Sequence, residues 1–493
     1  MGDNENRKVY KARQVKNYRE MVEYSCKNYA QNIAYKYKKD YTAKNVEYIE
    51  KTYEQVGKDI KAFGTGLLNL DLMGERIVVV GKNRYEWCIS YLATTCSNMV
   101  IVPIDKALPD IEMQRLIERS EAKAIIFDEK YLETIKKVQE KENSNLKTLI
   151  CMDNIQEKGI KTFNEILEEG RNQIKNGDQK YDNIEIDENK MSIMLFTSGT
   201  TNEPKAVMLS QANICANISN IACWVKLYPT DVLLSFLPIH HTFECTITFL
   251  YGFYSGSQVA FCDGLKHIQQ NLKEYKVSVF VAVPLVLETM YKKIQKAIEE
   301  QGKTGLIKKM TKISNTLLKA KIDIRKIVFK QILDNFGGHL RVVLYGAAPM
   351  NKATIIGYNN LGISLVQGYG LTETSPVVTA ETDKEKRPGS IGLALANLNL
   401  KIANPDNEGV GEITVKGPSV MLGYYKNPEE TKKVLKDGWF STGDYGYKDK
   451  DGFVYITGRK KDIIVLKNGK NVYPQEIEFL INKIPYIAES LVY

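Results

Sequence analysis

The sequence lacks the marks of several large protein classes. It has no run of about 18 apolar residues, so we expect no transmembrane helix. The opening MGDNENRKVY is polar and charged, which excludes a secretory signal. The eight cysteines are scattered singly, without a CxxC pair or zinc-ligand spacing, which favours a reducing compartment. Internal repeats and low-complexity segments are also absent, so we expect a globular, cytoplasmic protein.

Size and charge leave several functions open. A chain of 493 residues is too long for one simple domain, and a hydrophobic fraction of 43% is enough for a sizeable core. The net charge of +9 is compatible with nucleic acid, a membrane surface, small anionic substrates or a solvated lysine-rich surface. No aromatic and basic surface at the spacing of a known motif accompanies the charge, so we expect no nucleic-acid partner.

Apolar runs alternate with helical patterns in two parts of the chain. Strands are predicted at 74–81, 99–105 and 123–128, with helices between them at 85–95 and 111–120, and the same rhythm returns at 278–284 and 340–346. Such alternation predicts an α/β fold with mostly parallel sheets covered by helices. Residues 137–190 are polar, and we interpret them as surface elements leading to a strand at 191–196. After residue 400, short β-rich runs predict a barrel-like subdomain.

One long stretch, 303–335, is basic and helical in pattern, and it nearly lacks acidic residues. It is interpreted either as a helix that contacts a membrane surface or a partner, or as a solvated amphipathic helix.

The segment LFTSGTTNEPK (195–205) joins an apolar run to glycine, hydroxyl side chains and Lys205. Glycine lets successive backbone N–H groups turn toward one point, and lysine adds a positive charge for a phosphate oxygen. The spacing differs from GxxxxGK[ST], which disfavours a Walker-type loop. Phosphate binding and an ordinary turn both remain open from this segment alone.

Three further stretches favour nucleotide chemistry. VVLYGAAPM (342–350) ends a strand in small residues, which leaves room for a flat ring. QGYGLTET (367–374) offers Glu373, a carboxylate suited to Mg²⁺ beside a polyphosphate. STGDYGY (441–447) and ITGRKKD (456–462) offer Asp444 for the two hydroxyls of a ribose and Arg459 for ribose or phosphate.

Together, TSGTTNEPK, GYGLTET, STGD and GRKKDIIVLKNGKNVYPQEIE resemble the adenylate-forming enzymes, in the order and spacing of that superfamily, from about residue 20 to the end. FLPIHHTFE (236–244), GAAPM and the basic stretch before FGGHLRVVLYGAAP are most similar to long-chain fatty acid–CoA ligases.

The resemblance implies roles for single residues. The residues implied to bind ATP or AMP are Thr197, Ser198, Gly199, Thr200, Thr201, Lys205, Gly346, Ala347, Ala348, Pro349, Gly368, Tyr369, Gly370, Thr372, Asp444 and Arg459. Those implied to be catalytic are Lys205, Thr372, Glu373 and His241, with Glu373 and Thr197 at the metal. Without the resemblance, His241, Tyr369 and Asp444 have ordinary structural interpretations.

The resemblance also implies two domains: an adenylation domain over 1–461, with the barrel-like part at about 390–460, and the incomplete start of a mobile C-terminal domain at 462–493. Lys461 matches the hinge position, and 462–481 is predicted as a strand, an NGK turn, a second strand and a helix starting near Pro474. Asn202 stands where the family usually has glycine, and the chain ends before the family's C-terminal lysine, so we expect a fragment.

The implied function is activation of a fatty acid with ATP and Mg²⁺ to an acyl-AMP, with release of pyrophosphate, followed by transfer to CoA. One alternative is a ligase for another carboxylate, or one that loads an acyl carrier protein. An alternative of another class is a non-catalytic nucleotide- or acyl-binding protein, supported by the missing lysine.

Overall fold

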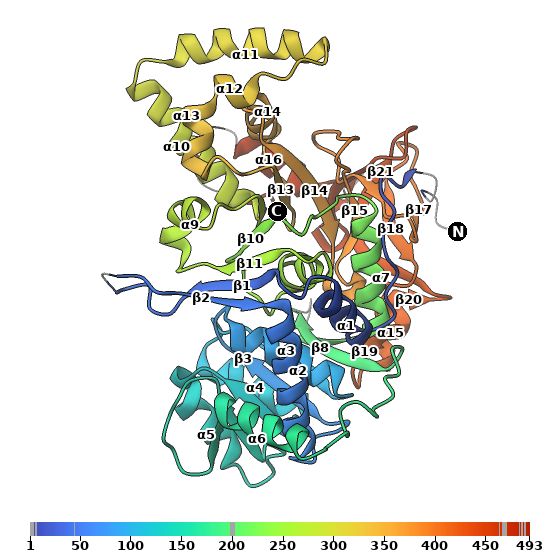
Figure 1. Ribbon diagram of the computed structural model, residues 1–493. Helices are drawn as coiled ribbons and strands as arrows, with labels where there is room; N and C mark the ends of the chain where they lie inside the picture. The colour runs from blue at the N-terminus through green and yellow to red at the C-terminus, as the bar shows by residue number, and fades with distance from the viewer. Residues whose placement is uncertain are drawn as a thin grey trace.

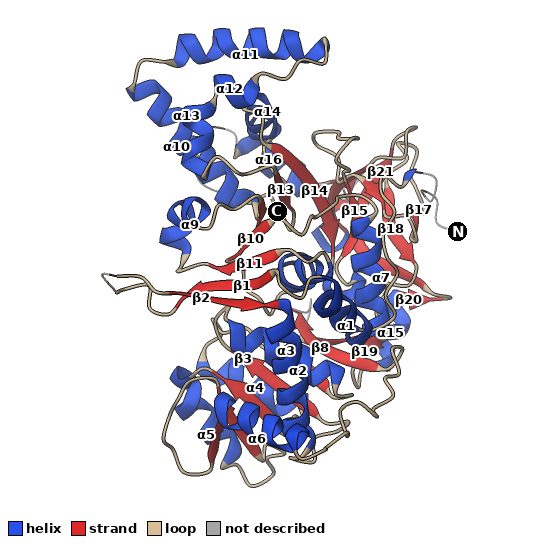
Figure 2. Ribbon diagram, in the orientation of Figure 1, coloured by secondary structure: helices blue, strands red, loops and turns tan. Residues whose placement is uncertain are grey.

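The computed structural model describes residues 4, 7–43, 45–197, 203–462, 464–465, 471–482, 484, 487 and 490–493. Figure 1 shows two large sheets with helices around them and a third sheet at the side, and Figure 2 separates the helices from the strands. No helix in these ranges is both long and apolar enough to span a membrane. None of the eight cysteines forms a disulfide.

The first large sheet has eight strands in the order β19-β9-β8-β4-β3-β5-β6-β7. Six of them run parallel: β3 (Arg76–Val80), β4 (Val100–Pro103), β5 (Ala124–Phe127), β6 (Thr148–Cys151), β7 (Ile160–Thr162) and β8 (Met191–Thr197). The last two strands at one side are antiparallel: β9 (Lys205–Ser210), which pairs with β8, and β19 (Gly423–Tyr424) at the edge. The strands predicted at 74–81, 99–105, 123–128 and 191–196 are therefore confirmed.

The interpretation of 137–190 as surface elements is wrong for part of that segment. Strands β6 and β7 belong to the sheet, and Leu149, Ile150 and Cys151 are buried in it. The apolar run is only four residues long and lies between lysine-rich segments, so the average polarity of the region hides it.

The second large sheet has nine strands in the order β16-β15-β14-β13-β12-β10-β11-β1-β2. The parallel strands are β1 (Ile33–Lys38), β10 (Val232–Ser235), β11 (Gln258–Phe261), β12 (Val279–Ala282), β13 (Val342–Tyr345) and β14 (Ser364–Gly370). Antiparallel strands complete both edges: β2 (Tyr48–Thr52), β15 (Val377–Ala380) and β16 (Leu393–Ala394).

Three hydrophobic clusters hold the layers together. The largest joins both sheets to α1 (Tyr18–Asn28), α2 (Tyr53–Leu68), α3 (Tyr85–Cys96), α6 (Phe163–Lys175), α7 (Gln211–Ala222), the π-helical η3 (Glu244–Tyr251) and α8 (Gly252–Tyr254). The second covers the eight-stranded sheet with α4 (Asp110–Ser120), η2 (Glu129–Tyr131) and α5 (Leu132–Gln139). The third covers the nine-stranded sheet with α9 (Ile268–Glu274), α10 (Pro284–Glu300), η5 (Asp334–Phe336) and α14 (Lys352–Asn360).

Local sequence explains where several helices begin. Thr52 and Gln55 form a capping box at the start of α2, and Thr162 and Glu165 form another at the start of α6. In each, the threonine hydroxyl and the side chain three residues later satisfy backbone N–H groups that the helix itself leaves unpaired.

The third sheet is antiparallel. It contains β17 (Asn399–Ala403), β18 (Gly411–Lys416), β21 (Trp439–Lys448), β20 (Leu435–Lys436) and β22 (Val454–Arg459), which pairs with β21. The β-rich prediction after residue 400 is confirmed, but no closed barrel forms among the described strands, because β17 and β22 do not pair. The short helix α15 (Pro428–Val434) precedes β20.

The predicted pattern of the last segment is confirmed where it is described: β23 (Ile464–Val465) pairs with β24 (Asn471–Val472), and α16 (Pro474–Ile481) follows. The NGK turn lies outside the described residues.

The basic stretch 303–335 is not one helix. It contains α11 (Thr304–Lys319), α12 (Arg325–Val328) and α13 (Lys330–Leu333), and the break after α11 passes through Lys321 at a φ of 63°. Helix α11 lies at the top of Figure 1, away from all the sheets.

Candidate active site

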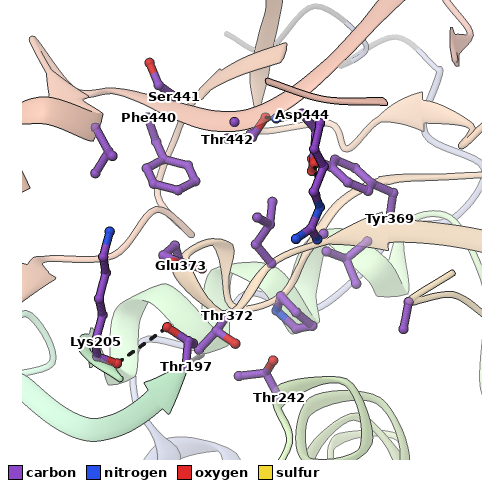
Figure 3. Close-up of a pocket in the computed structure, with 18 of the residues that line it drawn as sticks. Thr197, Lys205, Thr242, Tyr369, Thr372, Glu373, Phe440, Ser441, Thr442 and Asp444 are labelled. Carbon is purple, nitrogen blue, oxygen red and sulfur yellow. Dashed lines mark hydrogen bonds and ion pairs between the residues drawn. The ribbon is translucent and has the colours of Figure 1, made fainter. Parts of the chain in front are cut away.

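A cavity of about 880 Å³ opens where the carboxyl ends of β8, β13 and β14 meet, with β21 of the third sheet as the opposite wall. Ligands bind at this edge of parallel α/β sheets because the strand ends and the following loops present their polar groups there. Figure 3 shows Lys205 and Thr197 at one end of the cavity and Asp444 and Tyr369 at the other, with Thr372 and Glu373 between them.

Most of the predicted site residues are brought together. Those that line the cavity are Thr197, Lys205, His241, Gly346, Ala347, Gly368, Tyr369, Gly370, Thr372, Glu373, Asp444, Arg459 and Lys461. Ser198, Gly199, Thr200 and Thr201 lie outside the described residues, as does Asn202. Ala348 and Pro349 are exposed and are not among the residues that line the cavity, so their role in nucleotide binding stays a prediction. Ala347 lines the cavity at a φ of 70°, in the left-handed region of the backbone.

Lys205 lies at the start of β9, where the strand register pairs it with Thr197 of β8. Its Nζ lies 2.8 Å from Glu430 Oε2 and 5.1 Å from the centroid of the Tyr424 ring. The lysine side chain is only 14% exposed. The ammonium group is therefore held in the cavity by a carboxylate and an aromatic face.

Glu373 lies in the 3₁₀ turn η6 (Thr372–Thr374) that follows β14. The Tyr424 phenol donates a hydrogen bond of 2.9 Å to Glu373 Oε1, and the Met421 N–H donates one of 2.8 Å to the Glu373 carbonyl. The chain before the turn needs glycine, because a Cβ on Gly370 would lie 1.8 Å from the Pro376 carbonyl oxygen.

Asp444 and Arg459 face each other because β21 pairs with β22 in the register that puts them opposite. The Tyr369 phenol donates a hydrogen bond of 2.6 Å to Asp444 Oδ2, and Arg459 Nε lies 3.4 Å from Oδ1. Burial raises the pKa of Asp444 above its ordinary value, while Tyr369 and Arg459 act in the opposite direction. Tyr369 and Arg459 thus orient the Asp444 carboxylate, whose oxygens can accept hydrogen bonds from two neighbouring hydroxyl groups of a ligand.

Two adjacent histidines lie beside the cavity. Burial lowers the pKa of His241 and lowers the pKa of His240 to about 4, and the nearby Asp105 opposes both shifts. The Phe243 N–H donates a hydrogen bond of 3.2 Å to His241 Nδ1. His241 is thus a neutral imidazole with its proton on Nε2, which makes Nε2 a hydrogen-bond donor.

The described residues contain no cluster of three or more His, Cys, Asp and Glu side chains that could hold a metal ion by themselves. Glu373 and the hydroxyl groups of Thr197 and Thr372 fit a magnesium ion that is bound partly by substrate phosphate, since Mg²⁺ prefers oxygen ligands and few protein carboxylates.

Tyr424, Glu430 and Thr242 line the cavity, and sequence patterns did not single them out. Tyr424 reaches the cavity because β19 pairs with β9, a contact between segments over 200 residues apart. The available signal for Glu430 was the segment NPEET, in which Asn427 caps a helix that starts with proline and two glutamates.

Comparison with known proteins agrees with this geometry. The profile of the family described as AMP-binding enzyme matches residues 22–425. The chain belongs to the AMP-binding enzyme family.

Two relatives match over nine tenths of this chain. Long-chain-fatty-acid–CoA ligase 6 of Mus musculus is 31% identical over 476 residues, which cover 90% of this chain and 67% of the relative. Long-chain-fatty-acid–CoA ligase FadD15 of Mycobacterium bovis is 29% identical over 457 residues, covering 90% of this chain and 74% of the relative. The chain therefore spans about two thirds to three quarters of the length of these relatives.

Solved structures share the fold. A fatty acyl CoA synthetase of Mycobacterium tuberculosis has a TM-score of 0.71 at 22% identity, covering 97% of this chain and 85% of that one. ATP-bound MatB of Rhodopseudomonas palustris has a TM-score of 0.75 at 23% identity, with the same coverage.

Proposed function

We propose that the protein is a long-chain fatty acid–CoA ligase that forms AMP. The observation that carries the proposal is the arrangement of one cavity, which has Lys205 at one end, the Asp444, Tyr369 and Arg459 group at the other, and Glu373 between them. A cation, a central carboxylate and a ribose-type acceptor lie in the order that the terminal phosphates, the metal and the ribose of ATP require. The names of the relatives supply the substrate class.

The reaction proceeds in two steps. A carboxylate oxygen of the fatty acid attacks the α-phosphorus of ATP, a new P–O bond forms, and the bond to the β-phosphate breaks to release pyrophosphate. The thiol of CoA then loses its proton and attacks the acyl carbon, a C–S bond forms, and the bond to AMP breaks. A fatty acid is already an anion near neutral pH, so the first step needs no general base.

The main task of the site in the first step is to bring two anions together. We assign Lys205 to the β- and γ-phosphates, Thr372 to the α-phosphate, and Asp444 with Arg459 to the ribose. Gly346, Gly368 and Gly370 have no side chains, so they allow the adenine to lie against backbone. The neutral His241 can donate from Nε2 to the acyl carboxylate without adding a charge.

Magnesium is assigned to Glu373, with Thr197 as a further oxygen ligand. When bound, it neutralises phosphate charge and orients the leaving group. Tyr424 fixes the orientation of Glu373 through its hydrogen bond.

A substrate screen tests the function. The full chain is incubated with Mg·ATP and carboxylates of increasing length, and pyrophosphate release is measured first without and then with CoA. We expect release with long-chain fatty acids and AMP formation that depends on CoA. Preference for a short carboxylate, or transfer only to acyl carrier protein, would support the related ligases. Binding of AMP without pyrophosphate release from any carboxylate would support a nucleotide-binding protein.

We also propose that residues 303–335 contact an anionic membrane surface. Nine lysines or arginines and two aspartates fall within 301–335, so this segment holds +7 of the chain's net charge of +9. Three large apolar side chains of α11 are exposed: Leu306, Ile313 and Leu318. None of the four lysines in α11 pairs with an acidic side chain among the described residues. A basic, amphipathic and exposed helix has the properties of an interfacial helix.

A further inference from the structure

The Lys205 ammonium group already has an anionic partner in this structure. Glu430 Oε2 lies 2.8 Å from Lys205 Nζ, and Oε1 of the same carboxylate pairs with Lys433. These two lysines lower the pKa of Glu430 to about 2, so the carboxylate is charged near neutral pH. All three residues line the cavity.

Glu430 is fixed in place by its helix. Asn427 Oδ1 accepts a hydrogen bond of 3.1 Å from the Glu430 N–H, and Thr431 Oγ1 accepts one of 2.9 Å from the Tyr424 N–H. The first contact caps α15, and the second ties that helix to β19. The carboxylate is therefore a built part of the cavity wall, unlike a surface glutamate that meets a lysine by chance.

A phosphate bound to Lys205 must approach this carboxylate. Two anions that share one ammonium group in a partly closed cavity repel each other, because the local dielectric screens them less than water does. Lys205 therefore gains a phosphate partner at the expense of its contact with Glu430.

We propose that Glu430 competes with pyrophosphate for Lys205 and so promotes release of this product after the adenylation step. The inference rests on the proposed ligase function, in which Lys205 holds the leaving group. Once the bond between the α- and β-phosphates breaks, the carboxylate recaptures the ammonium group, and the affinity for pyrophosphate falls. Glu430 is a positioning residue, since it acts through Lys205 and does not touch the reacting atoms.

Direct binding tests the proposal without turnover. Magnesium pyrophosphate and AMP are titrated separately into the full chain by calorimetry, for the wild type, Glu430→Gln and Glu429→Gln. Glu429 is the matched control, because it is the preceding residue of the same helix, 79% exposed, and lies 3.6 Å from Lys432. AMP lacks the β- and γ-phosphates, so its binding reports whether the rest of the cavity is intact.

We expect Glu430→Gln to bind magnesium pyrophosphate roughly three- to tenfold more tightly, in the range of a partly exposed charge pair. AMP affinity should stay unchanged, and Glu429→Gln should match the wild type for both ligands. Glu430→Asp keeps the charge on a shorter side chain and should fall between the wild type and the glutamine variant. In turnover assays, Glu430→Gln should lower the KM for ATP and strengthen inhibition by added pyrophosphate.

A double variant distinguishes competition of Glu430 and pyrophosphate for Lys205 from direct charge repulsion between Glu430 and pyrophosphate. In a Lys205→Ala background, Glu430→Gln should give little gain in pyrophosphate affinity. An equal gain in both backgrounds would overturn the proposal, as would unchanged or weaker pyrophosphate binding by Glu430→Gln with normal AMP binding. Failure of the wild type to bind either ligand would overturn the ligase function itself.

Discussion

Tyr369 and Asp444 connect two sheets across the cavity. The tyrosine belongs to β14 of the nine-stranded sheet and the aspartate to β21 of the antiparallel sheet, and a hydrogen bond of 2.6 Å joins them. The bond orients the carboxylate that we assign to the ribose, and it lowers the pKa of Asp444 against the effect of burial.

Tyr369→Phe should therefore weaken AMP binding roughly three- to tenfold, because a hydrogen bond to a charged group is lost. The affinity can be measured by calorimetry. Tyr447→Phe is the matched control, since Tyr447 lies on β21, the strand that carries Asp444, and stacks on Tyr455 outside the cavity. Equal AMP affinity for Tyr369→Phe and the wild type would contradict the assignment of Asp444 to the ribose.

Glu373→Gln should reduce kcat/KM for Mg·ATP roughly 100-fold or more, because the variant loses the charge assigned to magnesium. Tyr424→Phe keeps the carboxylate but loses the bond that orients it, and a reduction of roughly 10-fold is expected. Both variants should bind AMP as the wild type does. Unchanged pyrophosphate release by Glu373→Gln would disprove the role of this residue.

Gly370→Ala should lower both the melting temperature and the use of Mg·ATP. The added Cβ would lie 1.8 Å from the Pro376 carbonyl oxygen, so the turn that carries Thr372 and Glu373 has to move. Gly305→Ala is the control, because its Cβ meets no atom within 4 Å and the position lies inside helix α11. That control should be neutral or stabilise the protein by about 0.5–1 kcal/mol.

Glu244 makes stability depend on pH. Full burial raises the pKa of its carboxyl group to about 8 from an ordinary value of 4.5, and Thr248 Oγ1 donates a hydrogen bond of 2.9 Å to it. Between these two pH values the folded protein keeps a proton that the unfolded chain releases, so the free energy of unfolding falls as pH rises from about 4.5 to 8.

Glu244→Gln removes this titration. The variant should gain stability over the wild type as pH rises, by an amount that approaches several kcal/mol at pH 8, since one pKa unit corresponds to about 1.4 kcal/mol. Denaturant unfolding at a series of pH values measures the difference, with the exposed Glu142→Gln as control. A constant difference across the series would show that Glu244 is charged in the folded protein.

Charge reversal on α11 tests membrane contact. Replacing Lys308, Lys309 and Lys312 by glutamate should abolish sedimentation with vesicles of anionic phospholipid, because each lysine near such a surface contributes about 1 kcal/mol. Pyrophosphate release with a fatty acid dispersed in detergent should be unaffected. Equal sedimentation of wild type and variant would contradict contact through this helix.

The sequence predicted those parts of the fold that have a local signal. Runs such as IVVV and VVLY form buried strands, because strands of a parallel sheet that is covered on both faces have apolar side chains on both faces. Asp444 reaches the cavity on β21, which lies in the predicted β-rich region. Thr372 and Glu373 follow β14, which was not predicted as a strand, so only the motif itself indicated their place in the site.

The remaining parts depend on pairings between distant segments. Tyr424 reaches the cavity on β19, and Glu430 on the helix α15 that is bonded to it. The partner of β19 is β9, far away in the chain, and no local pattern predicts that pairing. The sequence also predicted a barrel-like subdomain after residue 400. Whether such a sheet closes depends on a specific pairing of its edge strands, which β-rich composition alone does not determine.

The charge distribution of the molecule has a consequence for its approach to surfaces. Residues 301–335 carry +7 of the +9 charges, and α11 within them lies away from the sheets (Figure 1), so the rest of the chain is almost neutral. The protein is accordingly an electric dipole fixed in the frame of its fold. Near a negatively charged boundary a dipole experiences a torque, which turns α11 toward the boundary before any contact forms. Under the proposed membrane contact, molecules would arrive with α11 foremost, and the opening of the cavity would take a preferred angle to that boundary.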